Sequence, residues 1–349
     1  MNPKEMRGIE LIGHGGPEML VWNEAIPVPR PGPGDVLVRV AAAGVNNTDI
    51  NTRIGWYSKH DGDAADAGWG GSALSLPRIQ GADAAGEIVA VGDGVSGARI
   101  GERVLVEPCL TEWDGAALPS AWYLGSECDG AFAEYLRIPS VHAHRIETAL
   151  SDVELASFPC SYSTAENLLT RARVAGGDRV LITGASGGVG SAAIQLARAR
   201  GAEVVAVTSP AKADALTALG ASDILFRDDD PVEVLGESSV DAVIDLVGGA
   251  GFPRLLDVMA QFGRYAVSGA IGGPIVDLDL RTLYLKDLTF YGCTVLELGV
   301  FAALVKRIEA GEVRPLVAAT YPLKEIGTAQ AAFQEKAHTG KIVLTVAEG

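Results

Sequence analysis

Short apolar runs separated by glycine and proline dominate the first 150 residues of the chain. Three of these runs are rich in β-branched side chains: residues 36–40, 86–92 and 101–106. Runs of this length bounded by turn-forming residues are typical of β-strands. Residues 58–76 and 109–130 are polar and glycine-rich, so we predict long irregular loops there. The first part of the chain is therefore predicted to be β-rich.

After about residue 150 the pattern changes to strand-like segments that alternate with helix-like ones. The predicted strands show little polar alternation and cover residues 179–183, 203–207, 224–226, 240–245, 264–268 and 288–291. Helices are predicted over residues 191–200 and 211–219, the second ending at Gly220. Alternation of this kind indicates a parallel sheet covered by helices on both faces. Residues 341–346 form a last predicted strand, which we expect to return to the first domain.

Length and charge narrow the class of protein. A chain of 349 residues is longer than one hydrophobic core usually serves, so two domains are expected. The net charge of −16 opposes nucleic acid or an anionic membrane as the partner, since phosphate binding needs a basic face. Four scattered cysteines, with no secretory leader and no long apolar stretch, indicate a reduced cytoplasmic protein.

A glycine-rich turn carries the strongest local signal. Gly184, Gly187 and Gly190 follow a predicted strand and precede a predicted helix, with two residues between successive glycines. Such glycines permit a tight turn and close approach of a diphosphate to the free amides of the helix. We therefore predict a dinucleotide site formed by Gly184, Ser186, Gly187, Gly188, Val189 and Gly190. The alternative is a glycine-rich turn without a ligand.

The end of the second strand of this domain bears on the choice of coenzyme. NAD sites usually place a carboxylate there for the ribose hydroxyls, whereas this chain has Thr208 and Ser209, followed by Lys212. Hydroxyls and an ammonium group can bind a 2′-phosphate that a carboxylate would repel, and Arg227 would add a second cation. The pattern favours NADPH over NADH, unless Lys212 and Arg227 are ordinary solvated charges.

Motifs along nearly the whole chain resemble those of the medium-chain dehydrogenase/reductase superfamily. They include residues 33–38, 43–49, 81–86, 160–165, 184–190, 212–221 and 340–344. The resemblance implies a mixed α/β fold in which residues 1–150 form a GroES-like catalytic domain, joined again by residues 312–349. Residues 151–311 would form a Rossmann domain with a doubly wound parallel sheet, and the active site would lie in the cleft between the domains.

The residues at the zinc positions of that superfamily depart from its metal-dependent members. Those members carry Cys where this chain has Asn46, and Gly-His-Glu where it has residues 81–83. Cys160 matches the third ligand, but one thiol cannot hold a catalytic zinc, which needs three protein ligands. The region of the structural zinc lobe offers only Cys109 and Cys128. We therefore predict no bound metal.

Two other side-chain types invite a chemical interpretation. His142 and His144 would share one face of a strand, but they form no short metal-binding motif with a carboxylate or a cysteine. We therefore expect surface polar residues rather than metal ligands. Cys160 could be a nucleophile, although a small buried thiol is the commoner case, because nothing adjacent in sequence would lower its pKa.

Without zinc, an acceptor that is already electrophilic is favoured: a quinone, an enone or a reactive carbonyl. Resemblance to quinone oxidoreductases nominates Asn46 as a donor to the developing oxyanion, and Tyr57 as a second donor or a proton source. Solvent could supply the proton instead, and Tyr57 could be a packed aromatic side chain. Further expected coenzyme contacts, at strand ends and helix starts, are Thr164, Val247, Ser268, Gly269, Ala270, Cys293, Thr294 and Lys341.

Three other functions remain open at this point. A short-chain dehydrogenase would share the glycine pattern, but no tyrosine here has a lysine four residues later. A non-catalytic NADPH-binding protein and a zinc-type alcohol dehydrogenase are the others. In the superfamily the last Rossmann strand often pairs with its copy, and residues 288–295 match that strand, so we expect a homodimer acting on a small molecule.

Overall fold

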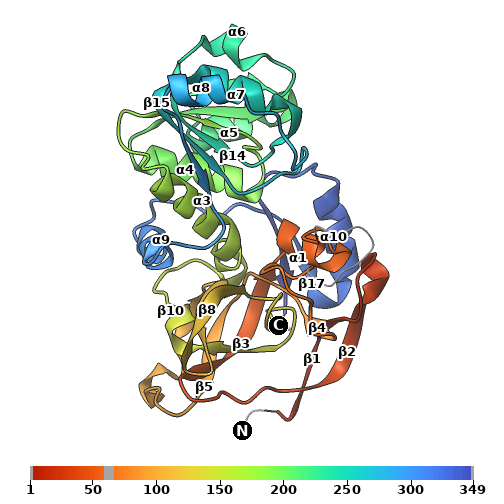
Figure 1. Cartoon of the computed structure of the whole chain (residues 1–349). Helices are drawn as coiled ribbons and strands as arrows, with labels where there is room; N and C mark the ends of the chain where they lie inside the picture. Colours follow the sequence, from red (N-terminus) through yellow and green to blue (C-terminus); the bar gives the residue numbers. More distant parts are fainter. Residues whose placement is uncertain (1–2, 59–66, 347–349) are drawn as a thin grey trace. The chain divides into compact units, whose positions relative to one another are not determined.

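The chain divides into two compact units, shown in Figure 1. The structure is a computed structural model that describes residues 3–58 and 67–346. Unit 1 consists of Met1–Cys160 with Pro315–Gly349, and unit 2 of Ser161–Arg314. In the described part of the chain, no helix has both the length and the apolar character that crossing a membrane requires.

The main sheet of unit 1 has seven strands. Its order is β10 (Ala143–Arg145), β6 (Arg103–Val106), β5 (Ala85–Val91), β3 (Asp35–Gly44), β18 (Lys341–Thr345) and β17 (Val317–Pro322), with β9 (Tyr135–Pro139) also on β3. The predicted strands at 36–40, 86–92 and 101–106 are confirmed as β3, β5 and β6, although β5 ends at Val91 and β6 begins only at Arg103. Strand β18 pairs antiparallel with β3, Val343 opposite Gly44, which confirms the expected return of the chain end to this domain.

The rest of unit 1 covers this sheet. A second sheet has the order β2 (Leu20–Pro27), β1 (Glu5–Leu11) and β4 (Arg78–Ile79), and the α-helices are α1 (Asn47–Ile54), α2 (Asp152–Leu155) and α10 (Ile326–Gln334). Single 3₁₀ turns lie at Pro17–Met19, Gly97–Arg99, Ser140–His142 and Leu323–Glu325. Apolar side chains from both sheets and from α10 form one core.

One predicted loop of unit 1 contains a hairpin. Residues 109–130 hold β7 (Cys109–Trp113) and β8 (Ala116–Tyr123), which pair antiparallel. Asp114 and Gly115 connect them with φ values of 51° and 72°. An Asp-Gly pair at positive φ is typical of a tight hairpin turn, so the loop prediction was wrong because this turn signal was overlooked. In the other predicted loop, residues 59–66 lie outside the described residues, and residues 67–76 contain no helix or strand.

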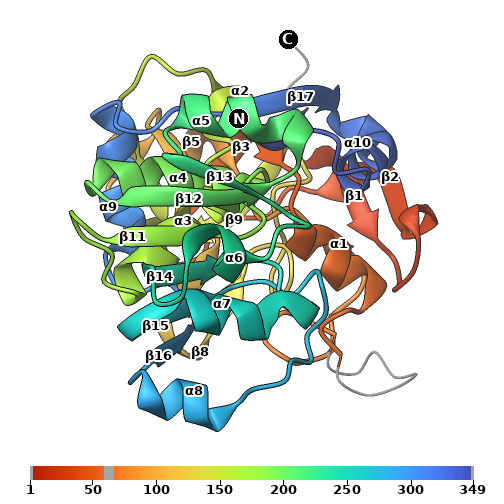
Figure 2. The ribbon, with the colours of Figure 1, turned by 90° about the horizontal axis from the view of Figure 1, so that it is seen from above.

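Unit 2 contains a six-stranded parallel sheet, which Figure 2 shows from above. The order is β13 (Asp223–Phe226), β12 (Glu203–Thr208), β11 (Arg179–Ile182), β14 (Val240–Asp245), β15 (Met259–Val267) and β16 (Thr289–Gly292). All six predicted strands are present, and the order 3-2-1-4-5-6 is that of a doubly wound Rossmann sheet. Because every strand is parallel, their carboxyl ends lie along one edge of the sheet.

The helices of unit 2 precede, connect or follow these strands. They are α3 (Pro159–Arg171, which begins in unit 1), α4 (Gly188–Ala199), α5 (Ala213–Leu219), α6 (Pro231–Leu235), α7 (Phe252–Val258), α8 (Leu280–Leu285) and α9 (Val300–Glu309), with 3₁₀ turns at Pro210–Lys212 and Gly249–Gly251. Helix α4 begins three residues before its predicted start, because the last glycines of the turn form its first helical turn. Helix α5 ends at Gly220, as predicted, with φ of 112°.

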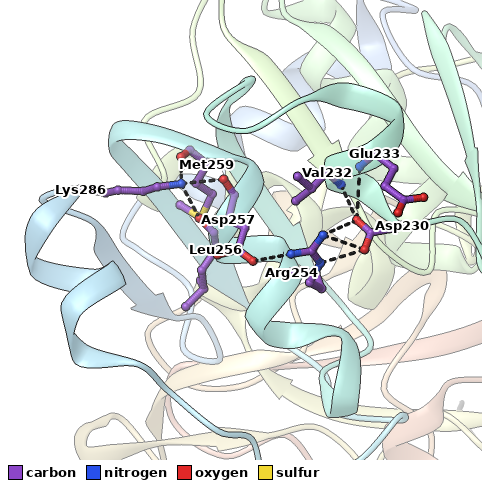
Figure 3. Close-up of polar contacts among 8 residues, drawn as sticks. All are labelled: Asp230, Val232, Glu233, Arg254, Leu256, Asp257, Met259 and Lys286. Carbon is purple, nitrogen blue, oxygen red and sulfur yellow. Dashed lines mark hydrogen bonds and ion pairs between the residues drawn. The ribbon is translucent and has the colours of Figure 1, made fainter.

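Two cations fasten the connections around α7, as Figure 3 shows. Lys286 donates to the carbonyl oxygens of Leu256, Asp257 and Met259 at 3.1, 2.6 and 2.9 Å. A cation is favourable at the carboxyl end of a helix, where carbonyl groups lack intrahelical partners. Arg254 joins Asp230 to Asp257. The segment from α8 to β16 is thereby attached to the end of α7.

Candidate active site

The glycine turn of unit 2 is built by close backbone contacts. Gly184 has φ of 58°, in the left-handed region that favours glycine. A Cβ on Gly190 would lie 2.4 Å from the carbonyl oxygen of Gly184, so no side chain fits there. At Gly187, by contrast, a Cβ would meet only that same oxygen, at 3.5 Å. The turn therefore leaves open space beside Gly187, where the first amides of α4 have no helical partner.

A buried carboxylate organises the edge of the sheet next to this turn. Asp245, at the end of β14, is fully buried. It accepts hydrogen bonds from the Thr183 hydroxyl at 2.5 Å, the Tyr265 hydroxyl at 2.5 Å, and the amides of Val247 and Gly248 at 2.9 and 3.1 Å. Burial, and then the charge of Asp245, raise the pKa of Tyr265. Sequence reasoning missed this hub, although an acid at the end of an apolar strand could have indicated it.

The end of β12 carries hydroxyl and cationic groups. The Thr208 hydroxyl is buried, and no residue in the described part of the chain forms a hydrogen bond with it. Ser209 and Lys212 are half-buried, and Arg227 is exposed. Burial, and then the positive charge of Arg227, lower the pKa of Lys212, so the two cations are close enough to repel each other. The half-buried Ser209 hydroxyl and these two cations are groups of the kind that bind phosphate.

The other predicted coenzyme contacts of unit 2 are distributed along the same sheet edge. Val247 follows β14, residues 268–270 follow β15, and Cys293 and Thr294 follow β16. Cys293 is buried, Thr294 is exposed, and Thr164 is half-buried on α3. Loops at the carboxyl ends of parallel strands are where nucleotides bind in such sheets. The donors and open space of this edge fit a dinucleotide.

In unit 1, the predicted catalytic residue Asn46 belongs to a buried polar cluster. Its side-chain nitrogen donates to Asp83 at 2.8 Å, and its side-chain oxygen accepts from Lys341 at 2.5 Å. Lys341 also forms an ion pair with Asp83, at 2.7 Å. The Asp49 carboxylate accepts a hydrogen bond from the main-chain N–H of Asn46 at 2.8 Å. All four residues are at most 5% exposed.

Lys341, which was predicted to contact the coenzyme, lies in this buried cluster of unit 1. Its three protons go to Asp83, to Asn46 and to the carbonyl oxygen of Val45 at 3.0 Å. An ammonium group has three donors, so this arrangement leaves none for a coenzyme phosphate. The sequence motif placed Lys341 near the active site, but the buried partners that occupy it come from distant parts of the chain.

The second predicted catalytic residue, Tyr57, lies just after α1. Its hydroxyl donates to the Thr48 hydroxyl at 3.1 Å, and its ring contacts Trp56 edge to face. Burial raises the pKa of Tyr57. The side chain is half-buried. This neutral phenol could donate to a ligand if its O–H turned away from Thr48, whose own hydroxyl could then donate to Tyr57.

Cys160 is a buried thiol that accepts a hydrogen bond from an aromatic hydroxyl. This fits a small buried thiol better than a nucleophile. Tyr123 donates to its sulfur at 3.1 Å, and Trp69 stacks on the Tyr123 ring with centroids 4.8 Å apart. Burial, followed by the charge of Asp83, raises the pKa of Cys160 to about 12. The thiolate is the nucleophile and the metal ligand, and this environment opposes its formation.

The positions that match zinc ligands come together in unit 1, but their chemistry does not fit zinc. Asp83 accepts from both the Asn46 side chain and the Cys160 amide, at 2.8 and 2.6 Å. The donor set is thus an amide, a protonated thiol and a carboxylate already paired with an ammonium group, while position 82 is alanine. Over residues 3–58 and 67–346, no group of three His, Cys, Asp or Glu side chains could hold a metal ion.

The histidine pair differs from its prediction. His142 is buried, and it lies in a 3₁₀ turn rather than on a strand. One oxygen of Glu107 lies 3.2 Å from His142 Nδ1 and 2.9 Å from His144 Nε2. Burial alone would raise the pKa of Glu107, but its contacts with the two imidazoles lower it overall. The expectation of surface residues was wrong because the partner is 35 residues away in sequence.

Comparison with known proteins adds independent information. A model of the alcohol dehydrogenase GroES-like domain matches residues 32–148, and a model described as zinc-binding dehydrogenase matches residues 188–310. A solved protein of Sinorhizobium meliloti 1021, assigned provisionally as an alcohol dehydrogenase, is 46% identical with a TM-score of 0.90, covering 99% of this chain and 98% of that one.

Two further similar proteins have more specific names. Quinone oxidoreductase of Homo sapiens is 28% identical, with 98% of each chain covered. A crotonyl-CoA carboxylase/reductase solved in complex with NADP is 27% identical with a TM-score of 0.87, covering 99% of this chain and 96% of that chain. The similarity spans both units of the chain.

Proposed function

Because this chain belongs to the medium-chain dehydrogenase/reductase superfamily, with quinone oxidoreductases among its relatives, we propose that it is an NADPH-dependent oxidoreductase that reduces an activated acceptor without a metal ion. The acceptor is a quinone, an enone or a reactive carbonyl. The observation that carries the proposal is the open glycine turn of residues 184–190, at the carboxyl edge of a doubly wound sheet.

The preference for NADPH rests on the end of β12. This strand ends at Thr208, where NAD sites usually place a carboxylate. The half-buried Ser209 hydroxyl and the cations Lys212 and Arg227 are suited to the additional phosphate of NADPH. The NADP complex of the related crotonyl-CoA carboxylase/reductase is consistent with this choice.

The bound coenzyme supplies a hydride from its nicotinamide ring. In unit 1, the Asn46 side chain donates a hydrogen bond to the oxygen on which negative charge develops as the acceptor is reduced. Tyr57, kept protonated by burial, is the second donor, and either Tyr57 or solvent protonates the product. Neither role requires a Lewis acid, because the acceptor carbon of a quinone or enone is already electrophilic.

A direct test is to follow oxidation of NADPH and NADH by the purified chain with quinones, enones, aldehydes and alcohols. We expect turnover with quinones or enones, a preference for NADPH, and substoichiometric zinc in protein prepared without chelators. Lys212→Ala removes a charge-assisted bond, so it should raise KM for NADPH by about 10-fold or more and leave KM for NADH unchanged.

Three outcomes contradict the proposal. Equal use of both coenzymes by the unmodified chain would remove the argument from the end of β12. Strong alcohol oxidation with stoichiometric zinc would favour a zinc-type alcohol dehydrogenase. Binding of NADPH without turnover of any acceptor would favour a non-catalytic NADPH-binding protein.

Lys324→Met serves as the control for the Lys212 variant, because it removes a lysine that is 65% exposed in unit 1.

The proposed enzyme is a homodimer formed through the edge of its parallel sheet. Strand β16 is the last strand of that sheet. Large apolar side chains that precede or follow it are more than half exposed: Ile271, Ile275, Leu280, Tyr284, Leu285 and Leu298. An unpaired strand edge bordered by exposed apolar residues is typical of a self-association surface. The four cysteines are buried and form no disulfide in the described part of the chain, which fits a reducing, cytoplasmic location.

A further inference from the structure

Asn46 has its side-chain amide held in one orientation by two oppositely charged partners. Lys341 can only donate, so the Asn46 atom beside it must be the oxygen, and a carboxylate such as Asp83 can only accept, so the atom beside it must be the nitrogen. A flip of the amide would place donor against donor and acceptor against acceptor. The charges around Asn46 therefore decide which end of its amide each partner binds.

The two partners of Asn46 are themselves fixed. Asp83 is fully buried, and its other oxygen accepts from the Cys160 amide at 2.6 Å. Gly44 allows Asp83 to approach the main chain closely, since a Cβ at that position would lie 2.2 Å from its carboxylate. Lys341 opens β18, which is held against β3 by strand pairing. The amide is thus held by groups whose own positions the backbone determines.

The two N–H groups of the Asn46 side-chain amide are held unequally. The first N–H is used by Asp83 at 2.8 Å, while the second makes only a 3.4 Å contact with the Gly44 carbonyl oxygen. A contact of that length is weak and easily exchanged for a better acceptor. The locked orientation therefore presents a donor, rather than the amide oxygen, to a developing oxyanion.

We propose that Lys341 and Asp83 are positioning residues, which form an internal cation–carboxylate pair that holds the Asn46 amide as a hydrogen-bond donor. Lys341 supplies a fixed positive charge among the positions that bind zinc in metal-dependent relatives. This inference rests on the proposed function, since it assigns Asn46 the role of donor to the acceptor. It also replaces the expectation that Lys341 binds the coenzyme.

The test compares Lys341→Met with the double variant Asp83→Asn/Lys341→Met. The single variant leaves Asp83 buried without its cation, so we expect a clear loss of thermal stability and a loss of kcat of about 100-fold. The double variant removes both charges. Unlike a carboxylate, an asparagine at position 83 can donate a hydrogen bond to Asn46, so we expect the Asn46 side-chain amide to turn over. We expect it to recover much of the stability but not kcat. In both variants the Kd for NADPH should stay within about twofold.

Lys286→Met provides the matched structural control. It removes a lysine that also donates three hydrogen bonds, but to backbone carbonyls at the end of α7 (Figure 3). We expect a loss of thermal stability with kcat unchanged. If Lys341→Met instead raises the Kd for NADPH tenfold and keeps kcat, Lys341 is a coenzyme ligand. If the double variant recovers kcat together with stability, the pair is merely structural. Either result overturns the proposal.

A spectroscopic measurement tests the orientation without any turnover. The chain has only six asparagines, so ¹⁵N-asparagine labelling gives few side-chain amide signals, and Asn46→Ala identifies the one of interest. We expect the N–H that Asp83 accepts to exchange slowly with solvent, and the signal of this amide to shift strongly in the double variant. An unchanged signal would overturn the inference. Absence of turnover in the unmodified chain would instead overturn the proposed function and leave this readout valid.

Discussion

Two fully buried carboxylates, Asp83 in unit 1 and Asp245 in unit 2, organise the two candidate sites. Asp245 is satisfied by hydroxyl and amide donors, whereas Asp83 is paired with an ammonium group. A buried charge is costly unless it is paired or fully hydrogen-bonded. In both cases the groups that contact the carboxylate are held in place, because moving one of them would leave a buried charge without its partner.

A third carboxyl group, Asp49, predicts a pH-dependent stability. Burial raises the pKa of Asp49 from 3.8 to about 7, and the charge of Asp83 adds to the rise. The main-chain N–H of Asn46 and the charge of Lys341 oppose it. Between these values the folded chain keeps a proton that the unfolded chain has lost. The stabilising contribution is thus complete below pH 3.8 and is lost as the pH rises through about 7.

Asp49→Asn removes this titration and keeps an oxygen that can accept from the Asn46 amide. We expect the melting temperature of the unmodified chain to fall relative to that of Asp49→Asn as the pH rises from about 5 to 8. Thermal unfolding followed by circular dichroism at several pH values measures the difference. A constant difference across that range would show that Asp49 titrates normally.

At the scale of elements, a turn and the helix after it create the proposed coenzyme site. The turn requires glycine at Gly190 because backbone atoms of residues 184 and 185 leave no room for a Cβ. At Gly187 glycine is required only if a ligand lies against it, since the space there is open. Glycine at position 190 is therefore needed for folding, whereas glycine at position 187 is needed only for the proposed binding.

Gly190→Ala should destabilise the chain by about 1–3 kcal/mol and weaken NADPH binding, because the new Cβ would force the turn apart. Gly187→Ala should change the free energy of unfolding by less than about 0.5 kcal/mol, since its φ of −75° suits alanine. It should nevertheless weaken NADPH binding, by filling space next to the diphosphate. Chemical denaturation and fluorescence titration measure the two effects. Normal NADPH affinity in Gly187→Ala would place the diphosphate elsewhere.

At the scale of the whole molecule, the exposed apolar residues near β16 predict self-association. Leu285 is 67% exposed on α8, which Lys286 ties to the end of α7. Leu285→Asp would place a charge in the proposed interface, at a cost of about 2 kcal/mol, and should weaken the dimer by about 30-fold. Light scattering across a dilution series measures the change. Ile100→Asp, at a residue 53% exposed in unit 1, should have no effect. A monomeric unmodified chain would contradict the prediction.

Local sequence patterns were sufficient to predict the parallel sheet of unit 2. The alternation of apolar segments predicted every strand of the parallel sheet, because strands buried on both faces must be apolar throughout. The glycine spacing located the turn between β11 and α4, because only glycine tolerates that φ and those contacts. The short strands of unit 1 were predicted in part. The hairpin of β7 and β8 was missed, although the Asp114-Gly115 pair carried its signal.

The partners of the buried polar groups were decided only by the tertiary structure. Asn46 and Lys341 are 295 residues apart in sequence, and Glu107 lies 35 residues from His142. The residues next to a position in sequence determine whether it lies in a strand or a helix. The charged groups that set its pKa and orientation come from distant parts of the chain that the fold brings together. Here the return of β18 to β3 brings the ammonium group to the amide. The sequence thus determined which groups the site contains, and the fold determined what each of them binds.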